Sequence, residues 1–249
     1  MARSRVRALE QRRVRGRQHR QTLALATIGV GGWSAVVLAG RLELALVGAG
    51  WWLLVSLMLD WHLGLVERPD GAPLAGLGAA NVLSLLRLAA VPALPALDPR
   101  LLAAALGAAG ALDVLDGRLA RARNEVTRLG FWLDGAADGV LLGTAALVLA
   151  SQGRLPTWAA GIVLARFALP WLGIATVSFV RAQVPGRGDA VSGKPTGVAL
   201  FSGLVLCGLG FPGGPAFVVA GAGFGLATLA ATGALRLARR DREAWLARG

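Results

Sequence analysis

Residues 113–138 read DVLDGRLARARNEVTRLGFWLDGAAD, and this stretch joins the end of one apolar segment to the start of the next. Four of the chain's nine aspartates lie in it, two on each side of the basic turn 122–129. Charged side chains are costly within apolar segments, so those found there are candidates for function. We expect the short turn to fold the two flanking helices antiparallel.

The aspartates recur at helical spacing and predict two polar stripes. Offsets of three, four, seven and eight residues bring side chains to one face of a helix, and so do repeats of four. The two stripes are expected to face each other across the turn. The first stripe consists of Asp113, Asp116, Gly117, Ala120 and Arg121, and the second of Gly130, Asp134 and Asp138.

The chain as a whole is too apolar for a soluble domain. It has 249 residues, of which 55% are hydrophobic, and a mean hydropathy of +0.59. A membrane-spanning helix needs about 20 apolar residues, and the chain offers eight candidate segments. They are approximately 22–40, 43–60, 77–97, 101–118, 130–151, 156–180, 195–211 and 215–235.

This pattern predicts an all-α polytopic membrane protein with a six-helix core and a two-span N-terminal hairpin. The second span is the weakest, because Glu43 and Asp60 leave only residues 44–59 uncharged, and an interfacial helix is the alternative. The expected divisions are a basic N-terminus (1–21), the hairpin (22–60), a linker (61–76), the core (77–236) and a basic tail (237–249).

Membrane topology explains the net charge of +12 better than nucleic-acid binding does, because the sequence contains no nucleic-acid-binding motif. With the N-terminus in the cytoplasm, only Arg41, Arg100 and Arg154 fall in outer loops, while Arg87 and Arg166 lie within spans. Every other Lys and Arg then faces the cytoplasm, as the positive-inside rule requires, and both termini are expected there.

Residues 1–20 hold eight arginines and one glutamate. They could form the charged region of a signal peptide, but no small-x-small cleavage site precedes the next span. We favour a topology anchor that touches anionic lipid headgroups.

Four carboxylates that converge near a membrane surface would repel one another unless a cation neutralised them. Oxygen ligands of this kind suit Mg²⁺ and similar hard divalent ions. With a single Cys, Cys207, and two His, the chain predicts neither a disulfide framework nor a zinc site. Two metal ions would polarise a phosphoanhydride; a proton relay remains an alternative. So do ordinary ion pairs at two helix ends, with the partners Arg118, Arg121, Arg123 and Arg128.

Residues 113–138 resemble the signature of the CDP-alcohol phosphotransferase family, D-x-x-D-G-x-x-A-R-x8-G-x-x-x-D-x-x-x-D, at every fixed position. Members of that family are six-span membrane enzymes and usually homodimers, and residues 77–236 look like their core. A second patch, NVLSLLRLAAVP (81–92), is similar to the family's first core helix, with Asn81, Ser84 and Arg87 near the nucleotide. An N-cap role for Asn81 and a snorkelling role for Arg87 are the alternatives.

The resemblance implies a role for each matching position. The four aspartates look like ligands of two divalent ions, Mg²⁺ or Mn²⁺, and Asp138 looks like the general base. Gly117 and Arg121 look like contacts to CDP, with Ala120 packing beside it. The donor would be CDP-diacylglycerol or a related CDP-alcohol, and CMP would leave. One departure is Gly139, where many members carry Lys or Arg.

The acceptor is the least defined part of the prediction. SFVRAQ (178–183) is similar to a stretch in members that use inositol phosphate, whereas SGKPTG (192–197) resembles phosphatidylglycerophosphate synthases, which favours glycerol 3-phosphate. In either case we expect basic side chains around the acceptor's phosphate. These are Arg181, Lys194 and Arg236.

Two other classes of protein remain as alternatives. A cation- or proton-coupled transporter could use the same acids, but it predicts ionisable groups or broken helices near the bilayer midplane. A catalytically silent scaffold is disfavoured by the intact signature. Arg166, in the middle of a span, is expected to line a polar cavity or to pair with a carboxylate.

Overall fold

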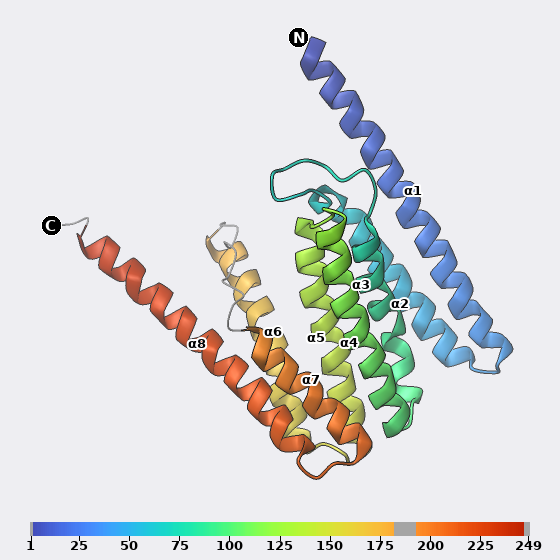
Figure 1. Ribbon diagram of the computed structural model, residues 1–249, viewed down its shortest axis with the longest axis vertical. Coiled ribbons are helices and arrows are strands. Elements are labelled where there is room, and N and C mark those ends of the chain that lie inside the picture. Colours follow the sequence, from blue (N-terminus) through green and yellow to red (C-terminus); the bar gives the residue numbers. More distant parts are fainter. Residues whose placement is uncertain (1, 182–192, 247–249) are drawn as a thin grey trace. The chain divides into compact units, whose positions relative to one another are not determined.

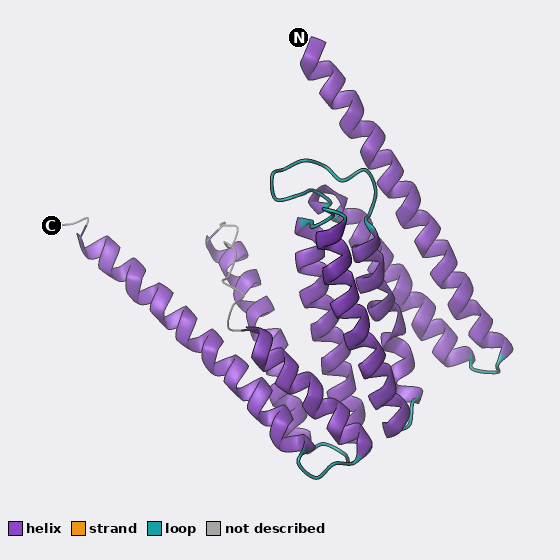
Figure 2. Cartoon of the chain, viewed as in Figure 1, coloured by secondary structure: helices purple, strands orange, loops and turns teal. Residues whose placement is uncertain are grey.

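The computed structural model describes the backbone of residues 2–181 and 193–246, and the side chains of residues 12–170, 172–173 and 195–232. Most of this part of the chain is helical, and a long loop joins the helix that ends at Trp61 to the helix that begins at Ala79 (Figure 2). It contains no β-strand, only an isolated bridge between Glu67 and Pro73, so the predicted all-α class is confirmed. The helices are α1 (Ala2–Leu38), α2 (Leu42–Trp61), η1 (Leu63–Leu65), α3 (Ala79–Ala90), η2 (Val91–Ala96), α4 (Pro99–Ala122), α5 (Arg128–Ser151), α6 (Thr157–Arg181), α7 (Gly193–Leu209) and α8 (Gly214–Leu246).

Five described helices are long and apolar enough to cross a membrane: Arg12–Leu38, Leu42–Trp61, Ala79–Ala96, Arg128–Ser151 and Gly214–Thr232. Thr157–Pro170 and Pro195–Leu209 are apolar but shorter. These findings confirm a multi-pass membrane protein. α4 is not among the five, and the reason lies in its sequence, since acids and arginines crowd its second half.

The chain divides into two compact units. The first contains residues 1–97 and 107–141, and the second contains residues 98–106 and 142–249. α4 and α5 each contribute to both units, and the turn that joins them belongs to the first.

In the first unit, α1 and α2 form an antiparallel hairpin (Figure 1). Trp52 is buried, and its indole N–H donates to the carbonyl of Leu25 at 3.0 Å. A side chain at Gly29 would overlap the Trp52 ring, so only glycine permits this approach. α2 thus packs as a full-length helix on α1, which favours a span over the interfacial alternative. α1 also runs without a break from the basic segment into the predicted first span.

The linker that follows the hairpin is tied back to α1 by side-chain amides. Gln18 is 2% exposed and donates from Nε2 to the carbonyl of Leu74 at 2.8 Å. Gln21 accepts the backbone N–H of Leu77 at 2.9 Å. Because both bonds satisfy polar backbone groups just before α3, they fix where that helix begins.

α3 and the parts of α4 and α5 next to their joining turn lie side by side (Figure 1). The buried residues beneath them include Leu77, Leu85, Leu88, Leu129 and Ala137. This core leaves the polar face of α3 directed at α4 and α5.

In the second unit, small residues let helices approach closely. A side chain at Gly203 of α7 would meet the backbone N of Val218 in α8 at 2.5 Å, and one at Gly221 would meet that of Leu200 at 2.4 Å. Helices in lipid associate through such close packing rather than through hydrophobic burial. Cys207 is 1% exposed and unpaired, as expected for a small core residue.

Candidate active site

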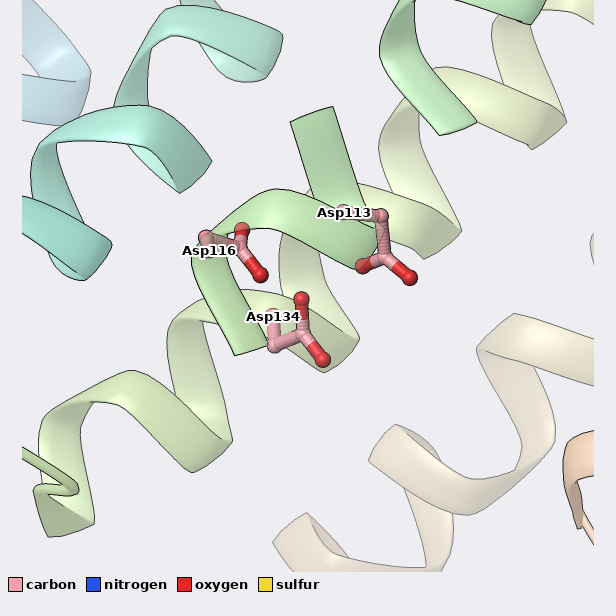
Figure 3. Close-up of side chains that lie close together, drawn as sticks. All are labelled: Asp113, Asp116 and Asp134. Atoms are coloured by element: carbon pink, nitrogen blue, oxygen red, sulfur yellow. The ribbon is translucent and has the colours of Figure 1, made fainter. Parts of the chain in front are cut away.

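The four aspartates converge between α4 and α5. Asp113 and Asp116 project from α4, and Asp134 projects from α5 toward both (Figure 3). One carboxylate oxygen from each of these three residues lies within 4.8 Å of the other two. The predicted facing of the two stripes is therefore confirmed.

Arg87 of α3 lies among all four acids. Its Nη1 is 2.9 Å from Oδ1 of Asp113 and 2.7 Å from Oδ1 of Asp138. Its Nη2 is 2.9 Å from Oδ2 of Asp116 and 2.5 Å from Oδ1 of Asp134. The side chain is 1% exposed, so the snorkelling alternative for Arg87 is wrong.

The alternative that the aspartates form ion pairs with the arginines of the two helix ends is wrong about the partners. Within the described residues, the ion pairs of the four aspartates all go to Arg87. Arg128 instead pairs with Glu67 of the linker at 3.0 Å. Arg118, Arg121 and Arg123 are exposed at the end of α4.

Ser84 and Asn81 share the face of α3 that carries Arg87, as predicted from their spacing. Ser84 donates from Oγ to Oδ2 of Asp116 at 2.9 Å. Asn81 donates from Nδ2 to the carbonyl of Leu77 at 2.6 Å and to Oγ1 of Thr127 at 3.2 Å. The N-cap alternative for Asn81 is wrong, because Gly78 is the N-cap of α3 and Asn81 lies within the helix.

The N-terminus of α5 is fixed by Thr127. Its Oγ1 accepts the backbone N–H of Gly130 at 2.9 Å, which is the usual bond of a helix N-cap. A Cβ at Gly130 would lie 2.7 Å from Oδ1 of Asn81. The signature glycine thus gives room for α3 to reach the start of α5.

The turn between the helices has a defined geometry. Asn124 has a φ of 54°, and the backbone N–H groups of Asn124 and Glu125 donate to the carbonyls of Arg121 and Ala120 at 3.3 and 2.8 Å. This is a Schellman motif with asparagine in the left-handed position. It brings Oε2 of Glu125 within 3.0 Å of the backbone N–H of Ala79, at the start of α3.

Glu125 was missed by the sequence reasoning. Its carboxylate links the α4–α5 turn to α3, the helix that supplies Arg87. In the sequence, Glu125 is marked only by its position after Asn124, a residue suited to the C-terminus of a helix. That position does not indicate that Glu125 binds Ala79.

Gly117, Ala120 and Arg121 continue the stripe of the aspartates along α4. Gly117 and Ala120 are half-buried, and Arg121 is exposed. A Cβ at Gly117 would lie 3.4 Å from Nη1 of Arg121. The guanidinium of Arg121 therefore folds back over the glycine, one turn beyond Asp116 and Asp113.

The donor set suits a hard divalent cation. It consists of carboxylate oxygens alone, and three of them lie close enough to one another to bind the same ion. Arg87 contacts one oxygen of each carboxylate. Its guanidinium therefore supplies a positive charge where the four negative charges would also attract a metal cation.

The structure does not test the predicted acceptor residues. The side chains of Arg181, Lys194 and Arg236 lie outside the described residues. Arg166 belongs to the second unit, where its guanidinium lies 5.6 Å from the ring centroid of Phe167. A side chain at Gly225 of α8 would overlap that guanidinium, so Arg166 packs against a glycine of α8.

The apolar helices and the converging carboxylates describe a multi-pass membrane protein with a candidate site for a divalent metal ion. The model of the CDP-alcohol phosphatidyltransferase family matches residues 77–232, and the chain belongs to this family. The match confirms the family predicted from residues 113–138. No comparison supports the transporter alternative.

Curated relatives come from two strains of Mycobacterium tuberculosis, CDC 1551 / Oshkosh and ATCC 25618 / H37Rv. In each strain the relative is described as a probable phosphatidylglycerophosphate synthase, and the chain is 33% identical to it over 120 residues. The alignment covers 43% of this chain and 57% of the relative. The chain thus spans a little over half the length of the curated relatives it matches.

Proposed function

We propose that the protein transfers a substituted phosphate group from CDP-diacylglycerol, or a related CDP-alcohol, to the hydroxyl group of an alcohol and releases CMP. The observation that carries this proposal is the convergence of four carboxylates from α4 and α5 on Arg87 of α3. Family membership supplies the class of reaction.

Asp113, Asp116, Asp134 and Asp138 are the residues that would hold two divalent ions, Mg²⁺ or Mn²⁺. When bound, such ions would polarise the diphosphate of the donor and stabilise charge that develops on its oxygens. The hydroxyl of Ser84 donates to Oδ2 of Asp116, and this hydrogen bond orients the Asp116 carboxylate for metal binding.

Asp138 is the proposed general base. Its carboxylate takes the proton of the acceptor hydroxyl as the hydroxyl oxygen attacks the β-phosphorus. A bond forms between that oxygen and the phosphorus, the phosphoanhydride bond to CMP breaks, and CMP leaves with the bridging oxygen. Asp138 is 42% exposed, so an acceptor can reach it.

The nucleotide is assigned to the continuation of the α4 stripe. Gly117 and Ala120 present no bulky side chain beside the helix, and the exposed Arg121, which lies over Gly117, supplies a charge for the phosphates. Asn81, Ser84 and Arg87 use their polar atoms within the protein. We therefore assign Ser84 and Arg87 a role in holding the aspartates that face the donor, and Asn81 a role in holding Thr127 at the start of α5.

Glycerol 3-phosphate is the acceptor we favour, because the relatives are described as phosphatidylglycerophosphate synthases. SGKPTG (192–197) agrees with this choice, while SFVRAQ (178–183) keeps inositol phosphate as the second candidate. Arg181, Lys194 and Arg236 are the proposed contacts to the acceptor phosphate.

The positive-inside pattern supports an active site on the cytoplasmic face with both termini on the same side. A homodimer is proposed from the family resemblance.

The test is release of CMP from CDP-diacylglycerol by the purified full chain, with and without EDTA, using glycerol 3-phosphate and inositol phosphate as acceptors. We expect release that requires Mg²⁺ or Mn²⁺, and a phospholipid product that identifies the acceptor. Asp138→Asn should abolish release. Asp98→Asn is the matched control, because Asp98 caps the start of α4 and asparagine caps as well. Undiminished release by Asp138→Asn would contradict the assignment of Asp138 as the general base. No release with either acceptor would contradict the proposed reaction.

A further inference from the structure

A cavity of about 520 Å³ lies in the first unit between α1, the segment 74–79 and the start of α3. Its volume is within the range of ordinary ligand pockets. α1 contributes Gln21, Ala24, Leu25 and Ile28 to its walls, and α3 contributes Val82. The walls from Ala24 to Ile28 are apolar, and the polar Gln21 lies at one end.

The cavity is separate from the aspartate site. Val82 lies five residues before Arg87 on α3, and five residues correspond to about 140° around a helix. The two side chains therefore leave α3 on different faces, one toward α1 and the other toward α4 and α5.

The setting of the cavity indicates a lipid chain. Both helices that wall it, Arg12–Leu38 and Ala79–Ala96, are long and apolar enough to cross a membrane. Ala24 is exposed and Ile28 is 70% exposed, so the cavity opens on the outer surface of the hairpin. Within a bilayer such a surface is covered by hydrocarbon, and an apolar cavity there takes up acyl chain rather than water.

The face of α1 above the cavity is basic. Arg17 lies four residues before Gln21, seven before Ala24 and eleven before Ile28, so it shares their face. Arg20 lies four residues before Ala24, at the edge of the same face. Both arginines are exposed. Arg17 and Arg20 precede the cavity-lining residues of α1 by one turn, and Nε of Arg20 donates to the carbonyl of Gly16 at 3.3 Å. Two cations next to an apolar cavity at the charged end of a span match the headgroup of an anionic phospholipid.

One acidic side chain, Glu125, also lines the cavity, and its carboxylate already has a partner within the protein. Oε2 of Glu125 accepts the backbone N–H of Ala79 at 3.0 Å. The partial positive charge of the α3 N-terminus offsets that carboxylate. The phosphate is expected on the opposite side of the opening, beside Arg17 and Arg20.

We propose that this cavity is a binding site for an anionic glycerophospholipid, with an acyl chain between α1 and Val82 and the phosphate at Arg17 and Arg20. The site is distinct from the aspartate site, and the proposal does not rest on the transfer reaction. It gives the N-terminal hairpin a function, and through Glu125 and Ala79 the bound lipid contacts the junction that holds α3 to the α4–α5 turn.

The test is native mass spectrometry of the full chain in detergent, titrated with phosphatidylglycerol or phosphatidylcholine of identical acyl chains. Phosphatidylglycerol is expected to bind at least about tenfold more tightly. Arg17→Gln combined with Arg20→Gln should weaken it by about tenfold or more, since each basic residue near a lipid headgroup contributes several-fold in affinity.

The matched control is Arg12→Gln combined with Arg15→Gln. These residues lie five and two positions before Arg17, on the opposite face of α1, and are also exposed. This pair should change the affinity by less than about twofold. If it weakens binding as much as the first pair, the basic segment acts as a whole and the proposed site is overturned.

Ala24→Phe tests the cavity itself. Ala24 is exposed, so the larger side chain fills the opening without entering the core, and Ile28→Trp gives a second obstruction at the mouth. Both variants should lose phosphatidylglycerol binding while keeping their circular dichroism spectrum and elution volume. Unchanged binding in both folded variants, or equal binding of the two lipids by the unaltered protein, would overturn the proposal.

Discussion

Nη2 of Arg87 on α3 lies 2.9 Å from Oδ2 of Asp116 on α4, and the two side chains are the least exposed members of the acidic site, at 1% and 8%. Arg87 also contacts Asp113, Asp134 and Asp138, whose side chains remain 42–49% exposed. The buried cation thus neutralises part of the charge of the four acids, and the three exposed carboxylates remain accessible.

Arg87→Gln should destabilise the protein when divalent ions are absent. Breaking a fully buried ion pair costs about 3–5 kcal/mol, and the exposure of three of the four acids reduces this to about 2–3 kcal/mol. The midpoint of thermal unfolding in detergent with EDTA measures the loss. Added Mn²⁺ should raise the midpoint more in this variant than in the unaltered protein, because Arg87 no longer opposes the incoming charge.

The control for this experiment is Arg121→Gln, which removes the same charge from an exposed position. Its stability should change by no more than about 0.5 kcal/mol. A midpoint for Arg87→Gln equal to that of the control would show that Arg87 is not the counter-ion of the acids.

Ser84→Ala should weaken metal binding without disturbing the fold. The lost hydroxyl leaves Oδ2 of Asp116 without the bond that orients it, and partners that orient ligands typically contribute 10- to 100-fold in affinity. We expect the lower end, about tenfold, because Arg87 still holds the same oxygen. Mn²⁺ binding followed by electron paramagnetic resonance gives the affinity directly.

Ser56→Ala is the matched control for Ser84→Ala, since Ser56 is also buried but lies on α2. It should leave Mn²⁺ binding unchanged. Equal effects of the two substitutions would assign Ser84 a packing role only.

The aspartates could be predicted because their positions depend on local geometry. Spacings of three and four residues fix which side chains share a helix face, and a short turn between two helices brings the faces together. The family signature then supplied the chemistry. Asp113, Asp116 and Asp134 accordingly meet where the sequence indicated.

The role of Arg87 could not be predicted to the same degree. Spacing placed it on one face with Asn81 and Ser84, but not against a particular partner, because the carboxylates it binds lie 26 or more residues away in the chain. The same holds for Glu125 and Ala79, and for the cavity beside α1. Contacts between distant segments depend on how helices pack, which periodicity does not encode.

Gly130→Ala should be destabilising because of Asn81. The new Cβ would lie 2.7 Å from Oδ1 of Asn81 and 3.2 Å from Oγ1 of Thr127. Asn81 is held by bonds to Leu77 and Thr127, so moving it costs about 1–2 kcal/mol. In an Asn81→Ala background the same change should cost less than about 0.5 kcal/mol. Thermal unfolding of the four proteins in this cycle measures the coupling, and additive effects would contradict it.

Asn124 provides a test of the turn that joins the two acidic helices. At a φ of 54° its backbone is left-handed, a conformation that costs a residue with a Cβ about 1–2 kcal/mol unless it is asparagine or glycine. Asn124→Ala should therefore lower the unfolding midpoint by about 2–8 °C, whereas Asn124→Gly should leave it unchanged or slightly higher. The Asn124 side chain is exposed, so its removal should cost little packing. Any packing that is lost would lower the midpoint in both variants alike. Only a lower midpoint for Asn124→Ala than for Asn124→Gly supports the left-handed turn. The same turn carries Glu125 to the start of α3, so CMP release should fall in Asn124→Ala and be retained in Asn124→Gly.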